Sequence, residues 1–137
     1  MKKRQPLSAS ETDLLKVLWK HTEATVPNLV NALNERRKPD DPLTRGTVQV
    51  LLNRVEVKGW VSRRKLGRGY LYKPTTSEAS GLAEFTQAFR SKVFDGSALQ
   101  LVQSLVKTQD LQREELDELR SLLDKVEAQL DQEEGRS

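Results

Sequence analysis

The chain has 137 residues, of which 31% are charged and 5% aromatic, with no cysteine and a single histidine. The lack of cysteine excludes disulfides, zinc ribbons, thiolate chemistry and cysteine-based copper sensing, and no apolar run approaches the ~20 residues that span a bilayer. Two lysines and an arginine stand at the start without an apolar stretch behind them, so we expect no signal peptide, no membrane binding and a cytoplasmic location.

The net charge of +3 conceals two halves of opposite sign. Residues 1–74 contain sixteen Lys and Arg against seven Asp and Glu, a net charge of +9. Residues 75–137 contain seven against thirteen, a net charge of −6. A basic half joined to an acidic half indicates that the first half meets a polyanion and the second does not.

Three helices are predicted before residue 60. We expect Ser10 to cap the first, over 11–21, Thr25 to cap the second and Thr44 to cap the third, which Gly59 ends. Apolar residues recur at helical spacing in each of them. The polar stretch 35–42 contains two prolines and separates the second helix from the third.

After Gly59 the pattern changes from helix to strand. Residues 60–65 and 70–73 predict two strands joined by the turn 66–69, since two glycines in four residues supply the positive φ of a tight hairpin. Tyr70 and Tyr72 are expected to brace this hairpin. Three helices followed by a basic hairpin predict a winged helix-turn-helix, and we expect it to form a DNA-binding domain over residues 1–76.

The second half is helical throughout. Its last helix has apolar residues spaced 3-4-3-4, which is a heptad seam of about two heptads. We therefore expect a helical dimerisation domain over 77–137, although a stripe packed on its own chain is the alternative. The residues predicted to form the dimer contact are Leu82, Phe85, Phe89, Leu116, Leu119, Leu123 and Val126. The expected fold class is mainly α with a small β-hairpin wing.

The third helix has an unusual outer face. Val48, Leu51, Leu52 and Val55 face the core, whereas the opposite side is polar or small and almost free of acid. Such a face suits the major groove, where Gln and Asn pair with adenine, Arg pairs with guanine and Val touches the thymine methyl. The predicted base-contacting residues are Arg45, Gly46, Thr47, Gln49, Val50 and Asn53.

Basic residues surround that helix in the sequence. On a hairpin beside a recognition helix they suit phosphate contacts or minor-groove insertion, whereas alone they could be a charged edge that resists aggregation. The predicted phosphate and wing contacts are Arg36, Arg37, Arg54, Arg63, Arg64, Lys65 and Arg68. Catalysis is not expected, since His21 has no evident partner and the chain has no phosphate loop or metal-ligand spacing; we expect no cofactor and no metal.

The order of these features resembles the penicillinase repressor family, the group of BlaI, MecI and CopY. The resemblance runs over about residues 7–130. It rests on the segments 7–11, 47–55 and 58–61, on 101–106, and most specifically on the Glu-Leu-x-Glu-Leu-Arg-x-Leu-Leu pattern within 114–123.

The resemblance implies a homodimeric repressor that binds double-stranded DNA at two-fold symmetric operators. Family DNA contacts map onto Gly46, Thr47, Gln49 and Val50, although better-known members often have basic residues at the positions of Gly46 and Gln49. In members that respond to β-lactams, a protease cuts the dimerisation region, which implies a membrane-bound sensor protease as a partner. The bond matching the family cleavage point is Ser104-Leu105. The cysteine-based copper response is excluded here.

Two other functions remain open from the sequence. One is a winged-helix regulator gated by a small ligand, which would need a pocket between the two halves. The other is a winged-helix adaptor that binds protein rather than DNA, which would present an exposed apolar patch instead of a basic face.

Overall fold

The computed structural model describes residues 4–108 and 111–135. Residues 1–3 and 136–137, at the ends of the two expected domains, and 109–110 lie outside the described residues. The chain divides into two compact units, which meet between Ala88 and Phe89. The sequence placed the domain boundary after residue 76, and the difference arises because the start of the next helix packs on the first unit.

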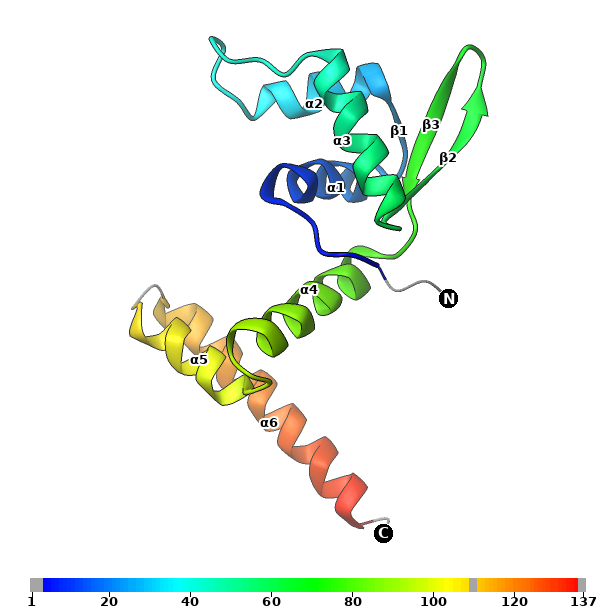
Figure 1. Cartoon of the computed structure of the whole chain (residues 1–137). Coiled ribbons are helices and arrows are strands. Elements are labelled where there is room, and N and C mark those ends of the chain that lie inside the picture. Colours follow the sequence, from blue (N-terminus) through cyan, green and yellow to red (C-terminus); the bar gives the residue numbers. More distant parts are fainter. Residues whose placement is uncertain (1–3, 109–110, 136–137) are drawn as a thin grey trace. The chain divides into compact units, whose positions relative to one another are not determined.

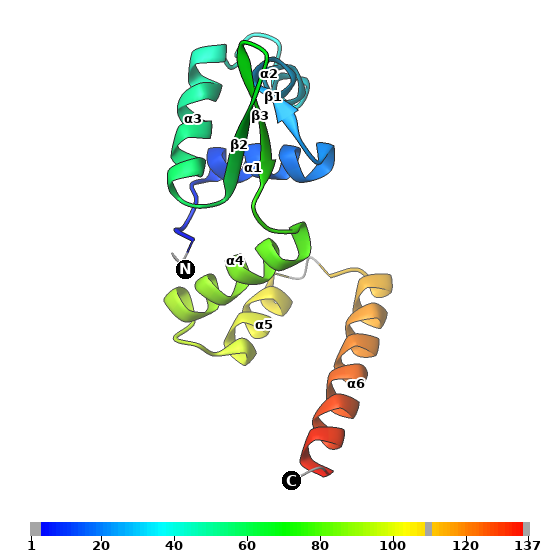
Figure 2. The same ribbon diagram turned by 90° about the vertical axis from the view of Figure 1, so that its right-hand side faces the viewer.

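The first unit combines helices with a small antiparallel sheet (Figures 1 and 2). In chain order it contains α1 (Ala9–His21), β1 (Ala24–Thr25), α2 (Val26–Glu35), α3 (Arg45–Val57), β2 (Val61–Leu66), β3 (Gly69–Pro74) and most of α4 (Glu78–Val93). The strands are ordered β1-β3-β2, and the short strand β1 was not predicted. The hairpin of β2 and β3 lies beside α3.

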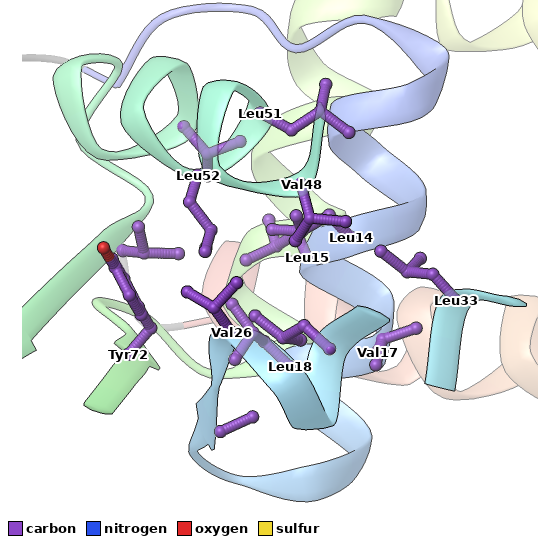
Figure 3. Close-up of a cluster of buried hydrophobic side chains, with 14 of the residues drawn as sticks. Leu14, Leu15, Val17, Leu18, Val26, Leu33, Val48, Leu51, Leu52 and Tyr72 are labelled. Atoms are coloured by element: carbon purple, nitrogen blue, oxygen red, sulfur yellow. The ribbon is translucent and has the colours of Figure 1, made fainter. Parts of the chain in front are cut away.

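The core of this unit lies where α1, α2 and α3 face one another. Figure 3 shows leucine and valine side chains from the three helices converging, with Tyr72 entering from the hairpin. Leu14, Leu18, Leu29 and Leu52 are fully buried. Each such side chain contributes roughly 1.5–3 kcal/mol by leaving water. The predicted core face of α3 is confirmed, because Val48, Leu51, Leu52 and Val55 are all buried.

A capping side chain begins each of α1, α2 and α3, but the cap of α1 is not the residue predicted from the sequence. Ser8, not Ser10, caps α1: its hydroxyl accepts from the Glu11 amide at 3.3 Å, and its amide donates to Glu11 Oε1 at 2.7 Å. This reciprocal pair needs a Glu or Gln three residues after the cap: Ser8 has Glu11 there, whereas Ser10 has the shorter Asp13. Thr25 and Thr44 cap α2 and α3 as predicted.

Glycine shapes the exit from α3 and the hairpin tip. Gly59 has φ of 92°, the Gly59 amide donates to the Glu56 carbonyl, and the Trp60 amide donates to the Val55 carbonyl. This is a Schellman end, which turns the chain into β2. Gly67, with φ of 60°, begins the two-residue loop between the paired Leu66 and Gly69, an arrangement that suits a type II′ turn.

The first turns of α4 pack on α1. Gly81 is buried, and a Cβ there would lie 2.6 Å from Cη2 of Trp19. The Phe85 ring lies 4.8 Å from that of Trp60 and 6.2 Å from that of Trp19, measured between centroids. These contacts explain why residues 77–88 belong to the first unit.

The second unit contains the end of α4, α5 (Ala98–Lys107) and α6 (Arg113–Gly135). Ser97 caps α5, and the Phe89 and Phe94 rings pack edge to face with centroids 5.5 Å apart. Among the described residues, neither α5 nor α6 has a buried side chain. The apolar faces of both helices are therefore exposed in the single chain.

Candidate nucleic-acid interface

The start of α3 is held in place by its own loop. The Asn34 side chain at the end of α2 accepts from the Leu43 amide at 2.7 Å and donates to the Leu43 carbonyl at 3.0 Å. The Thr44 hydroxyl accepts from the Thr47 amide at 3.2 Å. The N-terminal turn of α3 is thus fixed relative to α2, which is what a helix that reads DNA requires.

The outer face of α3 presents the predicted base-contacting residues to solvent. Arg45, Gly46, Thr47 and Asn53 are exposed, and Val50 is 48% exposed. At Gly46 an added Cβ would meet no atom nearer than the Thr44 hydroxyl at 3.9 Å, so packing within the chain does not require glycine there.

Gln49 differs from its neighbours, because it is half-buried and held. Its Nε2 donates to Asn53 Oδ1 at 3.0 Å and to the Tyr72 hydroxyl at 3.1 Å. Tyr72 is 1% exposed and belongs to the hairpin. A side chain of the helix is therefore tied to the wing, a contact that the sequence did not reveal.

The basic residues of β2 alternate between the two faces of the hairpin. Residues paired across strands lie on the same face, so Arg63 and Lys65 share a face with Tyr72 and Tyr70, while Arg64 lies on the other face. Arg63 lies 4.4 Å over the Tyr70 ring, and its Nε is 3.4 Å from Glu56 Oε2 on α3. A hydrogen bond to Tyr72 and the charge of Glu56 raise the pKa of Arg63, so it stays cationic.

The remaining predicted phosphate contacts are all exposed, and they differ in their partners. Arg64 lies 3.7 Å from Glu23, and Arg37 lies 2.8 Å from Asp41. Within residues 4–108 and 111–135, no ion pair involves the other four: Arg36, Arg54, Lys65 and Arg68. Surface pairs such as these are worth roughly 0–1 kcal/mol, so a phosphate can replace Glu23 or Asp41 at little cost.

The predicted dimer residues fall into two groups. Phe85 packs against Trp19 and Trp60 within the first unit, so its ring already has partners in the chain. The others offer more exposed surface, with Leu82 40%, Phe89 50%, Leu123 65% and Val126 50% exposed. Leu119 is 36% exposed and Leu116 is half-buried.

The bond between Ser104 and Leu105 lies inside α5. Both residues are exposed, but each is in regular helix. A protease that binds its substrate in extended form would first have to unwind this part of α5.

Two features are absent from the described part of the chain. No three His, Cys, Asp or Glu residues there gather in a way that could hold a metal ion. No helix there is both long and apolar enough to cross a bilayer.

Three packed helices followed by a basic hairpin, with the outer face of the third helix free, define a winged helix-turn-helix of the DNA-binding class, which confirms the predicted fold. A model of the penicillinase repressor family matches residues 7–125. The chain belongs to this family, as the sequence resemblance indicated.

The chain is similar to two individual relatives and to one solved structure. The chain is 26% identical over 124 residues to the penicillinase repressor of Bacillus licheniformis, and this match covers 90% of this chain and 94% of that protein. It is 26% identical over 123 residues to the methicillin resistance regulatory protein MecI of Staphylococcus aureus (strain N315), covering 90% and 97%. The solved structure of the MarR C80S mutant from E. coli complexed with operator DNA is 26% identical with a TM-score of 0.50, covering 88% of this chain and 75% of that one.

Proposed function

We propose that this protein is a homodimeric, sequence-specific DNA-binding transcriptional repressor without catalytic activity, which acts in the cytoplasm on two-fold symmetric operators. The observation that carries the proposal is the outer face of α3. It is exposed, nearly free of acidic side chains and adjacent to a hairpin with five basic residues. A helix of this kind in the major groove, with the wing on the adjacent backbone, accounts for both features.

The residues divide into two roles. Arg45, Thr47, Gln49, Val50 and Asn53 lie where a duplex along α3 would present its base edges, and Gly46 lets the backbone come close. The basic side chains of the wing and of the loop before α3 neutralise phosphates, which sets affinity and register but not sequence preference. The net charge of +9 on residues 1–74 adds long-range attraction.

The homodimer is supported by the apolar faces of α5 and α6. Exposed leucines and valines along two successive helices are costly in water and are typical of a surface that another chain covers. Two half-sites then bind as one tight complex, because the second contact forms at a high effective concentration. The relatives are named as a repressor and a regulatory protein, which accords with a role in transcriptional repression.

Release from the operator has two candidate routes. Cleavage at Ser104-Leu105 by a membrane-bound sensor protease would separate α6 from the DNA-binding unit and so break the link between half-sites. Alternatively, a small ligand could act at a hollow of about 220 Å³ against the start of α3, whose lining includes Asp13, Arg37 and Thr47. A ligand there would touch a base-contacting residue directly, and it would raise the melting temperature while lowering affinity for DNA.

The test is selection of bound duplexes from a fully randomised library by the whole chain. The expected result is a palindromic consensus whose half-sites lie about 34–36 Å, or a multiple of that, apart. Binding to the selected duplex should survive competition by a large excess of unrelated DNA. A protein adaptor, by contrast, would enrich no consensus and would bind all DNA weakly.

A further inference from the structure

Both amide hydrogens of Gln49 are already used inside the chain. A carboxamide has two N–H donors and one carbonyl acceptor. In Gln49 the two donors reach Asn53 Oδ1 at 3.0 Å and the Tyr72 hydroxyl at 3.1 Å. The carbonyl oxygen of Gln49 remains available to a ligand on the outer face of α3.

Tyr72 is a rigid anchor for this arrangement. It is 1% exposed, and strand pairing places it opposite Arg63 on β2 and Ala24 on β1. A tyrosine ring packed in a core has little room to change its rotamer, because neighbouring side chains fill the space around it. Its hydroxyl therefore holds the Gln49 carboxamide in one orientation.

Asn53 takes the opposite role one turn later on α3. Its Oδ1 accepts from Gln49, so its Nδ2 group is the end left for an outside partner. Asn53 is exposed, as this role requires. The two amides thus present an acceptor and a donor on successive turns of the same helix.

We propose that Tyr72 is a positioning residue that sets the base preference of α3, by holding Gln49 so that it offers its carbonyl oxygen alone to DNA. This inference rests on the proposed function. Gln49 then accepts from an exocyclic amino group, which cytosine N4 and adenine N6 both supply in the major groove. Asn53 donates to an acceptor such as guanine O6 or N7, or thymine O4. The bidentate pairing of Gln with adenine, which the sequence suggested, does not form while the Tyr72 hydroxyl holds the amide.

The decisive variant is Tyr72→Phe, which keeps the ring and removes the hydroxyl. One N–H of Gln49 is then free, so Gln49 can pair with adenine through both ends. In selections from a randomised duplex library, the position that Gln49→Ala relaxes should move from accepting cytosine or adenine to requiring adenine. The expected gain in discrimination is about 5- to 150-fold, corresponding to the 1–3 kcal/mol of a bidentate pair. Affinity for unrelated DNA should stay the same within about twofold, because Tyr72→Phe leaves every basic side chain in place and Arg63 keeps its ion pair with Glu56.

Two further variants provide a matched control and an independent second test. Tyr70→Phe removes a neighbouring hydroxyl from a 40% exposed ring of the same hairpin and should leave the preference unchanged. Gln49→Glu has only acceptor oxygens, so it should still favour a base with an amino group, whether or not Tyr72→Phe proves stable.

The outcomes separate this inference from the proposed function. If the wild type selects a consensus but Tyr72→Phe selects the same one, or Gln49→Glu loses its preference as Gln49→Ala does, the role of Tyr72 is refuted and DNA recognition stands. If the wild type selects no consensus at all, the proposed function fails and this inference fails with it.

Discussion

Lys58 Nζ lies 2.7 Å from Glu11 Oε1 and 3.1 Å from Oε2, so this ion pair joins the first turn of α1 to the residue that follows α3. The Glu11 side chain is 2% exposed and also accepts from the Ser8 amide. Burial opposes ionisation of this carboxyl, but hydrogen bonds from Lys58 and Ser8 outweigh it and hold the pKa of Glu11 below its ordinary value of 4.5.

Glu11→Gln should therefore destabilise the protein at neutral pH by about 2 kcal/mol. Losing one partner of a fully buried pair costs roughly 3–5 kcal/mol, and Lys58 is 27% exposed, which lowers the cost. Urea unfolding at pH 7 measures the difference. Asp13→Asn, an exposed carboxylate on the same helix, is the control and should change the unfolding free energy by less than about 0.5 kcal/mol.

The same pair predicts a pH dependence. Because the pKa of Glu11 is lower in the folded state than in the unfolded chain, its contribution is fully present above the ordinary value near 4.5. It is lost as the pH falls through the lower folded-state value. The gap in unfolding free energy between wild type and Glu11→Gln should therefore narrow below about pH 4.5. A gap that stays constant down to pH 3 would mean that folding does not change the pKa of Glu11.

Gly81→Ala should destabilise the first unit by roughly 1–3 kcal/mol, the usual cost of overpacking. A Cβ there collides with the Trp19 ring, whose indole N–H donates to the Thr76 carbonyl at 2.9 Å. Thermal unfolding followed by tryptophan fluorescence measures both the stability and the displaced ring. Gly135→Ala, which meets nothing within 4 Å, should have no such effect.

Leu123→Asp should convert the dimer to a monomer without unfolding the chain, because Leu123 is 65% exposed in the single chain. Affinity for the selected palindrome should fall by roughly 10²–10⁴, the usual loss when two linked sites are separated. Sedimentation and duplex titration report the two effects. Ser121→Asp adds the same charge off the apolar seam of α6, and it should remain dimeric. If Leu123→Asp remained dimeric, the dimer contact would have to lie elsewhere in the chain.

Lys65→Ala should reduce the salt dependence of DNA binding. Each neutralised phosphate contributes roughly −0.9 to the slope of log affinity against log salt, so losing one contact per subunit should flatten the slope by about two in a dimer. Titrations at salt concentrations from about 50 to about 200 mM measure this slope. Lys20→Ala, at the end of α1, should leave the slope unchanged. If the wild type, Lys65→Ala and Lys20→Ala all gave the same slope, Lys65 would not be a DNA contact.

The features that neighbouring residues control could be predicted from the sequence alone. Apolar spacing determined the buried face of α3, Thr25 and Thr44 marked two helix starts, and glycines marked the end of α3 and the hairpin tip. The first cap was misplaced by two residues, because Ser10 and Ser8 both fit the composition and the reciprocal bond with Glu11 decides between them. The division into a basic and an acidic half was also evident from the sequence, because charged residues can be counted without a structure.

The tertiary structure alone decided which of these residues meet across the chain. Gln49 and Tyr72 are 23 residues apart, and Lys58 and Glu11 are 47 apart. Phe85 looked like part of a dimer stripe, but it packs on Trp19 and Trp60 of its own unit. Local pattern sets which face of a helix is apolar, whereas the partner that covers this face, and the polar atom that a half-buried amide reaches, depend on how distant segments pack together.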